Sequence, residues 1–119
     1  MSNYKIRLGK FGEQLAAEFL KRNGYKIIDK NFYTPFGEID LIAESGDEIL
    51  FVEVKARSGE DFGYPEVAVD RRKTSHLLKT IGLYLERKNL NNFWRLDIIS
   101  VEIDRARKVA KVKWFKGIG

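Results

Sequence analysis

The chain has 119 residues and a formal net charge of +5 at pH 7, with no cysteine and one histidine. This length predicts a single domain, residues 1–119, that buries enough surface to fold without disulfides. The composition excludes a disulfide-rich scaffold and argues against a structural zinc site, which needs several Cys or His ligands. No apolar run approaches membrane-spanning length and no apolar signal core follows the N-terminus, so we expect a cytoplasmic protein.

The N-terminal half predicts one helix and three strands. Apolar residues recur at helical spacing from about residue 5 to Arg22, and Gly24 follows as a stop signal. The apolar stripe of this helix contains Ile6, Phe11, Leu15, Ala16, Phe19 and Leu20. Residues 25–32 predict a strand, and the turn at 34–37 leads into two further strands, 37–43 and 49–57.

The C-terminal half predicts a loop, a helix and two strands. Residues 58–65 form either a mobile lid or a plain connection, and Asp70 can cap a helix that runs to about Lys88. The apolar stripe of this helix is Leu77, Leu78, Ile81, Tyr84 and Leu85. Strands follow at 94–103 and 109–115. The order α-β-β-β-α-β-β predicts an α/β fold with a central mixed sheet and both helices packed on it.

The two strands at 37–43 and 49–57 form a predicted hairpin whose register can be counted. Gly46-Asp47 suits a two-residue turn, which places Ile42 opposite Phe51 and Asp40 opposite Glu53. Opposed residues share a face of the sheet, about 5 Å apart at their Cβ atoms. One face is then expected to hold Glu38, Asp40, Glu53, Lys55 and Arg57. The other face is expected to hold Ile39, Leu41, Ala43, Leu50, Val52, Val54 and Ala56.

Charged side chains within these apolar strands indicate a functional site. The neighbouring carboxylates of Asp40 and Glu53 repel each other unless a positive charge lies between them. Oxygen ligands suit a hard cation such as Mg²⁺ or Mn²⁺, which activates water and offsets charge on a phosphoryl oxygen. Lys55, on the same face, would orient the water or stabilise the transition state. The alternative is a cross-strand ladder in which Lys55 pairs with Glu38 and Asp40.

Basic residues near this site suggest a polyanionic partner. Arg57 and Lys73 are candidate phosphate ligands, because cationic side chains make most positioning contacts with nucleic acids. The alternative for each is a solvated surface charge. The net charge of +5 is a moderate excess, which also fits ordinary solubility.

The combined pattern resembles the YraN family of bacterial endonuclease-like proteins. That family lies within the PD-(D/E)xK nuclease superfamily and is similar to archaeal Holliday-junction resolvases. The matching features are Gly12-Glu13 with Ala16-Ala17, Asn23-Gly24-Tyr25, residues 37–43 and 51–57, Phe62-Gly63, Lys73 and Arg95-Leu96-Asp97. Ile39 stands where the motif of the superfamily has a proline, a position that varies in the superfamily.

The resemblance implies a restriction-endonuclease-like fold and a set of site residues. Asp40, Glu53 and Lys55 match the catalytic motif, and Glu13 matches an acidic residue that the first helix often adds. Mg²⁺ or Mn²⁺ would be held by Asp40, Glu53 and Glu13, with the Val54 carbonyl as a further ligand. Periodicity alone favours a different interpretation of Glu13, as a solvated helix residue or a partner of the helix macrodipole. The implied activity is endonucleolytic hydrolysis of nucleic acid, with structured or branched DNA as the expected substrate and a homodimer as the expected assembly.

Two other functions stay open on the sequence. The first is a nucleic-acid-binding accessory protein that keeps the nuclease fold with little or no turnover. The second is a protein-interaction module with an ordinary salt-bridged sheet, which predicts no Mg²⁺ binding and no salt-sensitive DNA affinity.

Overall fold

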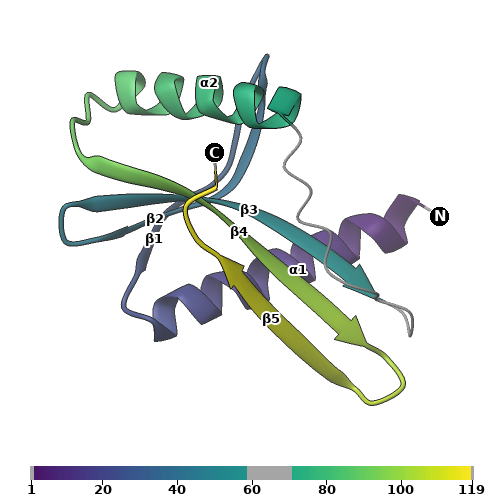
Figure 1. Ribbon diagram of the computed structural model, residues 1–119. Coiled ribbons are helices and arrows are strands. Elements are labelled where there is room, and N and C mark those ends of the chain that lie inside the picture. Colours follow the sequence, from purple (N-terminus) through teal and green to yellow (C-terminus); the bar gives the residue numbers. More distant parts are fainter. Residues whose placement is uncertain (1, 59–70, 119) are drawn as a thin grey trace.

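A five-stranded mixed sheet forms the centre of the computed structural model, which describes residues 2–58 and 71–118 (Figure 1). The elements are α1 (Ser2–Arg22), β1 (Lys26–Thr34), β2 (Gly37–Ser45), β3 (Glu48–Ser58), α2 (Arg71–Arg87), β4 (Phe93–Asp104) and β5 (Val109–Phe115). The strands lie side by side in chain order, and β3 and β4 are parallel while the other neighbours are antiparallel. The predicted α/β class, mixed sheet and element order are confirmed. The predicted loop at 58–65 and the cap at Asp70 lie almost entirely outside the described residues.

Helix α1 covers one face of the sheet and α2 the other (Figure 1). On the α1 side, the buried core consists of Ala16, Ala17, Leu20, Leu41, Ala43, Leu50, Val52, Ile99 and Val101. Close packing begins at Gly12, where an added Cβ would lie 2.6 Å from the Cβ of Ala56. Ile6 and Phe11, which precede this contact, are 54% and 47% exposed, so their predicted place in the buried stripe is wrong. No helix of the described ranges is both long and apolar enough to cross a membrane.

The core beneath α2 differs from the predicted stripe at one position. It consists of Ile39, Ile42, Ile49, Phe51, Leu77, Ile81, Tyr84 and Leu96. Leu78 is 40% exposed, and Thr80 is fully buried in its place. The Thr80 hydroxyl hydrogen-bonds to the His76 carbonyl oxygen at 2.9 Å and to the Thr34 hydroxyl at 3.0 Å, so its burial leaves no polar atom unpaired.

The hairpin of β2 and β3 has the predicted register over part of its length. The paired residues run from Ser45 opposite Glu48 to Leu41 opposite Val52, and Ile42 lies opposite Phe51 as expected. Beyond Leu41 the ladder ends, because the Val54 N–H donates to Asp40 Oδ2 at 2.7 Å.

The end of the ladder changes the face assignment of β2. Ile39 packs in the core beneath α2, whereas Leu41 packs beneath α1. The prediction that both residues share one face is therefore wrong. The predicted opposition of Asp40 to Glu53 also falls beyond the paired residues. A strand that leaves its neighbour no longer keeps the strict alternation of a paired ladder, so residue counting fails there.

A fully buried carboxylate joins β4 to the C-terminal segment. Asp97 accepts two hydrogen bonds from the Arg95 guanidinium, at 2.9 and 3.0 Å. It also accepts one from Trp114 Nε1 and one from the Gly117 N–H, both at 2.7 Å. Arg95 and Asp97 thus form an ion pair, and the hydrogen bond to Asp97 is the largest cause that raises the pKa of Arg95.

Substituting Asp97→Ala leaves the indole and guanidinium donors without their acceptor. We expect a loss of about 3–5 kcal/mol in the free energy of unfolding, since breaking a buried charge pair strands its partner. Urea unfolding, monitored by circular dichroism, measures this free energy. The matched control is Glu18→Ala, an exposed acid on α1, which should change stability by less than about 0.5 kcal/mol. Equal small effects of both substitutions would contradict the proposed role of Asp97.

Substituting Gly12→Ala places a methyl group against Ala56 and forces α1 away from β3. We expect a loss of about 1–3 kcal/mol, as for other overpacked cores, together with displacement of the adjacent Glu13. The control Gly9→Ala lies on the same helix with nothing within 4 Å of the new Cβ, and it should stabilise by about 0.5–1 kcal/mol. Thermal unfolding of both variants distinguishes the two effects, and equal melting temperatures would rule out the close contact.

Candidate metal centre

Three carboxylates from two elements meet where β2 leaves β3. Glu13 comes from α1, and Glu38 and Asp40 come from β2. Each offers one oxygen atom, and these three atoms lie within 4.8 Å of one another. All three residues are half-buried, so solvent screens their mutual repulsion only in part.

Asn31 on β1 bridges two of these carboxylates. Its side-chain Nδ2 donates to Glu13 Oε1 at 3.1 Å and to Glu38 Oε1 at 2.9 Å. The backbone of Asn31 has a φ of 50°, in the left-handed region that Asn tolerates better than most residues. This conformation directs the amide toward α1 and β2 together, so β1 helps to hold Glu13 beside Glu38.

Asp40 has a pKa raised from 3.8 to about 7. Burial of the carboxyl is the largest cause, the hydrogen bond from the Val54 N–H opposes it, and the nearby charges of Glu38 and Glu13 raise it further. The same negative charges, with Glu38 first, raise the pKa of the exposed Tyr33. The site therefore concentrates negative charge that only a proton or a cation can offset.

Glu53 faces the same cavity as Asp40 from the neighbouring strand. The cavity measures about 250 Å³ and is lined in part by Glu38, Asp40, Glu53 and Lys73. Glu53 is 8% exposed and forms an ion pair with the Lys73 ammonium group on α2. The structure thus brings Lys73 to the site and pairs it with a predicted metal ligand.

The other predicted site residues lie along β3. Lys55 is half-buried, and no hydrogen bond or ion pair joins its side chain to any residue in the described ranges. Its predicted alternative pairing with Glu38 and Asp40 is therefore not formed there. Val54 donates its N–H to Asp40, and Arg57 pairs with Glu102 of β4 at 3.0 Å, so Arg57 does not join the acidic group.

Two members of the site were missing from the set of residues predicted to act in it. Glu38 was expected only to share the charged face, and Asn31 was not singled out. The signal for Glu38 is its position two residues before Asp40 on the same strand. No sequence signal reveals Asn31, because its contact depends on how α1 packs against β1.

The donor set fits a hard divalent cation. Oxygen ligands from three crowded carboxylates are what Mg²⁺ and Mn²⁺ prefer. Within residues 2–58 and 71–118, no Lys or Arg forms an ion pair with Glu13, Glu38 or Asp40. The raised pKa of Asp40 is the expected sign of such a site before its charge is offset.

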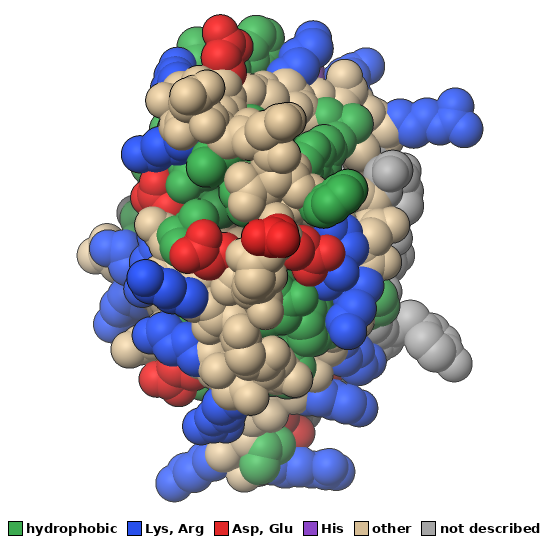
Figure 2. All heavy atoms as spheres, turned by 90° about the vertical axis from the view of Figure 1, so that its left-hand side faces the viewer, with side chains coloured by type: hydrophobic (Ala, Val, Ile, Leu, Met, Phe, Trp, Pro, Cys, Tyr) green, Lys and Arg blue, Asp and Glu red, His purple; other side chains and the backbone are tan. Residues whose placement is uncertain are grey.

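Basic side chains are spread widely over the face shown in Figure 2. Lys and Arg side chains lie at its top, along its sides and at its lower end, and a row of acidic side chains lies across its middle. The net positive charge is thus not gathered into a single patch on this face.

Comparison with known proteins places the chain in a family. The sequence pattern of the Uncharacterised protein family UPF0102 matches residues 12–101. The chain belongs to this family. A UPF0102 protein of Moorella thermoacetica is 40% identical over 118 residues, covering 98% of each chain. One of Syntrophomonas wolfei is 45% identical over 100 residues, covering 82% of this chain and 85% of its own.

The segment that defines UPF0102 membership contains the whole acidic group. Glu13, Asn31, Glu38, Asp40 and Glu53 all fall within residues 12–101. A UPF0102 protein of Clostridium botulinum, strain Loch Maree, is 39% identical over 111 residues, covering 92% of this chain and 90% of its own. UPF0102 is the YraN family, so the resemblance expected from the sequence motifs is confirmed at the level of the family.

The raised pKa of Asp40 makes stability depend on pH. Between the ordinary pKa of 3.8 and the folded value of about 7, the folded state binds this proton more tightly than the unfolded state does. Stability from this group is therefore present at low pH and lost as the pH rises through about 7. Relative to Asp40→Asn, which cannot ionise, we expect the wild type to lose about 2–4 kcal/mol between about pH 4 and pH 8.

Urea unfolding of both proteins across this pH range, in buffer free of divalent cations, measures the difference. Glu18→Gln serves as the control and should follow the wild type at every pH. Parallel curves for wild type and Asp40→Asn would show that Asp40 ionises with an ordinary pKa.

Proposed function

We propose that this protein is a metal-dependent endonuclease that hydrolyses phosphodiester bonds in nucleic acid, with structured or branched DNA as its substrate. The observation that supports it best is the group of Glu13, Glu38 and Asp40, whose oxygens lie within 4.8 Å of one another around a carboxyl with a raised pKa. A bound Mg²⁺ or Mn²⁺ would supply Lewis-acid activation of water and offset the charge of the phosphate.

Each carboxylate has an oxygen to offer such a cation. Asp40 Oδ2 accepts the Val54 N–H, which fixes the side chain and leaves Oδ1 for a ligand. Glu13 Oε1 accepts from Asn31 in the same way, which leaves Oε2. Glu53 would join after exchanging its ion pair with Lys73, and the Val54 carbonyl is a further proposed ligand.

Lys55 is the proposed electrostatic catalyst. It follows Glu53 by two residues on β3, and no carboxylate of the described ranges neutralises it. An ammonium group in a half-buried position stabilises a developing negative charge more strongly than one in bulk water, because solvent screens it less. We therefore assign it to orienting the attacking water or stabilising the pentacoordinate transition state at phosphorus.

Lysines on both sides of the acidic group support a nucleic-acid substrate. Lys73 lines the cavity beside α2, and Lys5 and Lys10 line a second cavity of about 260 Å³ beside α1. Glu38 borders both cavities, so a strand crossing the site would meet cations before and after the carboxylates. Such contacts recognise backbone and shape rather than base sequence, and we propose a homodimer as the acting form.

The test is cleavage of labelled single-stranded, duplex, flap and four-way-junction DNA with Mg²⁺, Mn²⁺ or EDTA. We expect metal-dependent cutting by the wild type and a loss of about 100-fold or more in Asp40→Ala and Lys55→Ala. Glu18→Ala is the matched acidic control and should cut normally. Thermal unfolding gives a second readout, because Mg²⁺ should raise the melting temperature of the wild type and not that of Asp40→Ala.

The ion pair of Glu53 with Lys73 favours one rival function. If this pair persists in solution, the Glu53 carboxylate stays bound to Lys73 and cannot bind the metal ion. The protein would then bind nucleic acid without cleaving it. DNA binding without cutting on any substrate would establish that accessory function. Cutting that survives both substitutions would show that the site is placed wrongly or that a contaminant is responsible.

A further inference from the structure

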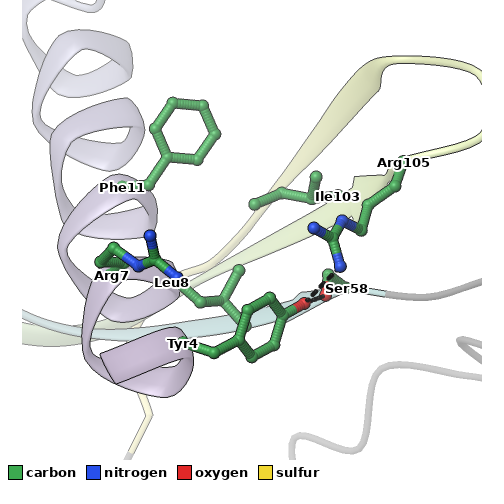
Figure 3. Close-up of a pocket in the computed structure, with 7 residues that line it drawn as sticks. All are labelled: Tyr4, Arg7, Leu8, Phe11, Ser58, Ile103 and Arg105. Carbon is green, nitrogen blue, oxygen red and sulfur yellow. Dashed lines mark hydrogen bonds between the residues drawn. The ribbon is translucent and has the colours of Figure 1, made fainter. Parts of the chain in front are cut away.

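A separate cavity of about 330 Å³ lies between the N-terminal half of α1 and the ends of β3 and β4 (Figure 3). It shares no lining residue with the cavities beside the acidic group. Tyr4 and Arg7 project from α1, and Ser58 ends β3. Arg105, just after β4, reaches across toward Tyr4 and Ser58 (Figure 3).

The hydroxyl groups on one wall hold Arg105 in place. Its Nη1 donates to the Tyr4 hydroxyl oxygen at 3.3 Å, and its guanidinium lies 5.1 Å from the centre of the Tyr4 ring. The Tyr4 hydroxyl in turn hydrogen-bonds to the Ser58 hydroxyl. On the other wall, Arg7 Nε donates to the backbone oxygen of Asn3 at 3.3 Å. None of these partners carries a negative charge.

The nearby carboxylates are engaged by other cations. Glu102 pairs with Arg57 at 3.0 Å and with Lys113 at 3.8 Å, and Asp104 pairs with Arg107 at 3.7 Å. Within residues 2–58 and 71–118, neither Arg7 nor Arg105 therefore has a carboxylate partner, although both line one cavity. A guanidinium group without a carboxylate partner is suited to a phosphate, which it can bind through two N–H donors.

The rest of the lining is apolar and fits more than an isolated phosphate. Leu8 and Ile103 contribute aliphatic surface, and Phe11 lies beside them with 47% of its surface exposed. Aromatic rings of this kind stack on nucleic-acid bases. The volume of about 330 Å³ lies within the range of small-ligand sites. We propose that this cavity binds a nucleoside monophosphate group, with the phosphate at Arg7 and Arg105 and the base against Phe11.

Binding in this cavity needs none of the acidic residues, so it is independent of the proposed nuclease activity. Calorimetric titration with adenosine monophosphate tests it directly. We expect binding by the wild type and an affinity lower by about tenfold or more in Arg105→Gln, which loses a charged donor. The control Arg107→Gln removes the same charge from the same turn, where Arg107 pairs with Asp104, and should leave the affinity unchanged. An equal loss in both variants, or no binding by the wild type, would overturn the proposal.

A second variant separates recognition of the base from recognition of the phosphate. Phe11→Leu should weaken adenosine monophosphate by about fivefold or more, as expected for a lost stacking contact, and leave inorganic phosphate unaffected. Equal affinities of the wild type for inorganic phosphate and for adenosine monophosphate would overturn the assignment of a nucleoside.

The source of the group, a free nucleotide or a nucleic-acid strand, is distinguished in the Asp40→Asn background, where the proposed cleavage is removed. If a strand occupies the cavity, adenosine monophosphate displaces a labelled single-stranded oligonucleotide, and adding Arg105→Gln weakens both ligands. If a free nucleotide occupies it, Arg105→Gln weakens adenosine monophosphate alone. Failure to cleave DNA in the separate nuclease test leaves this result unchanged.

Discussion

The hydrogen bond from the Val54 N–H to Asp40 Oδ2, at 2.7 Å, marks the point on which the arrangement of the site depends. A side-chain oxygen takes a backbone donor beyond the last paired residues of β2 and β3. The two strands separate there, and Ile39 turns into the core beneath α2 while Leu41 stays beneath α1. Where the two strands separate, Glu13 of α1 lies beside Glu38 and Asp40 of β2.

Packing of the neighbouring elements holds the three carboxylates together against their mutual repulsion. Gly12 lets α1 approach Ala56 so closely that no side chain fits between them, and Glu13 is the next residue. Asn31 then holds Glu13 and Glu38 through one amide. The apolar cores stabilise the fold enough to hold these like charges close together. Such destabilising charge clusters are typical of functional sites, which are kept for ligand binding and not for stability.

The sequence predicted what depends on local pattern and failed where distant elements meet. The Gly46-Asp47 turn and the alternation of β3 were enough to place Ile42 opposite Phe51. Asp40, Glu53 and Lys55 were singled out because charges are rare in apolar strands. The pairing of Glu53 with Lys73 was not foreseen, because it spans the connection to α2 and depends on how that helix docks.

The buried carboxylate of Asp97 also bears on the order in which the chain can fold during synthesis. Its partners are Arg95, which is two residues away, and Trp114 and Gly117, which are made only after β4 is complete. In a ribosome-bound chain that ends after β4, this strand is an edge of the sheet and Asp97 lacks half of its donors, and burying the carboxylate without them is costly. We expect the sheet to close only after β5 has emerged, so that a partly synthesised chain does not yet hold an assembled acidic site.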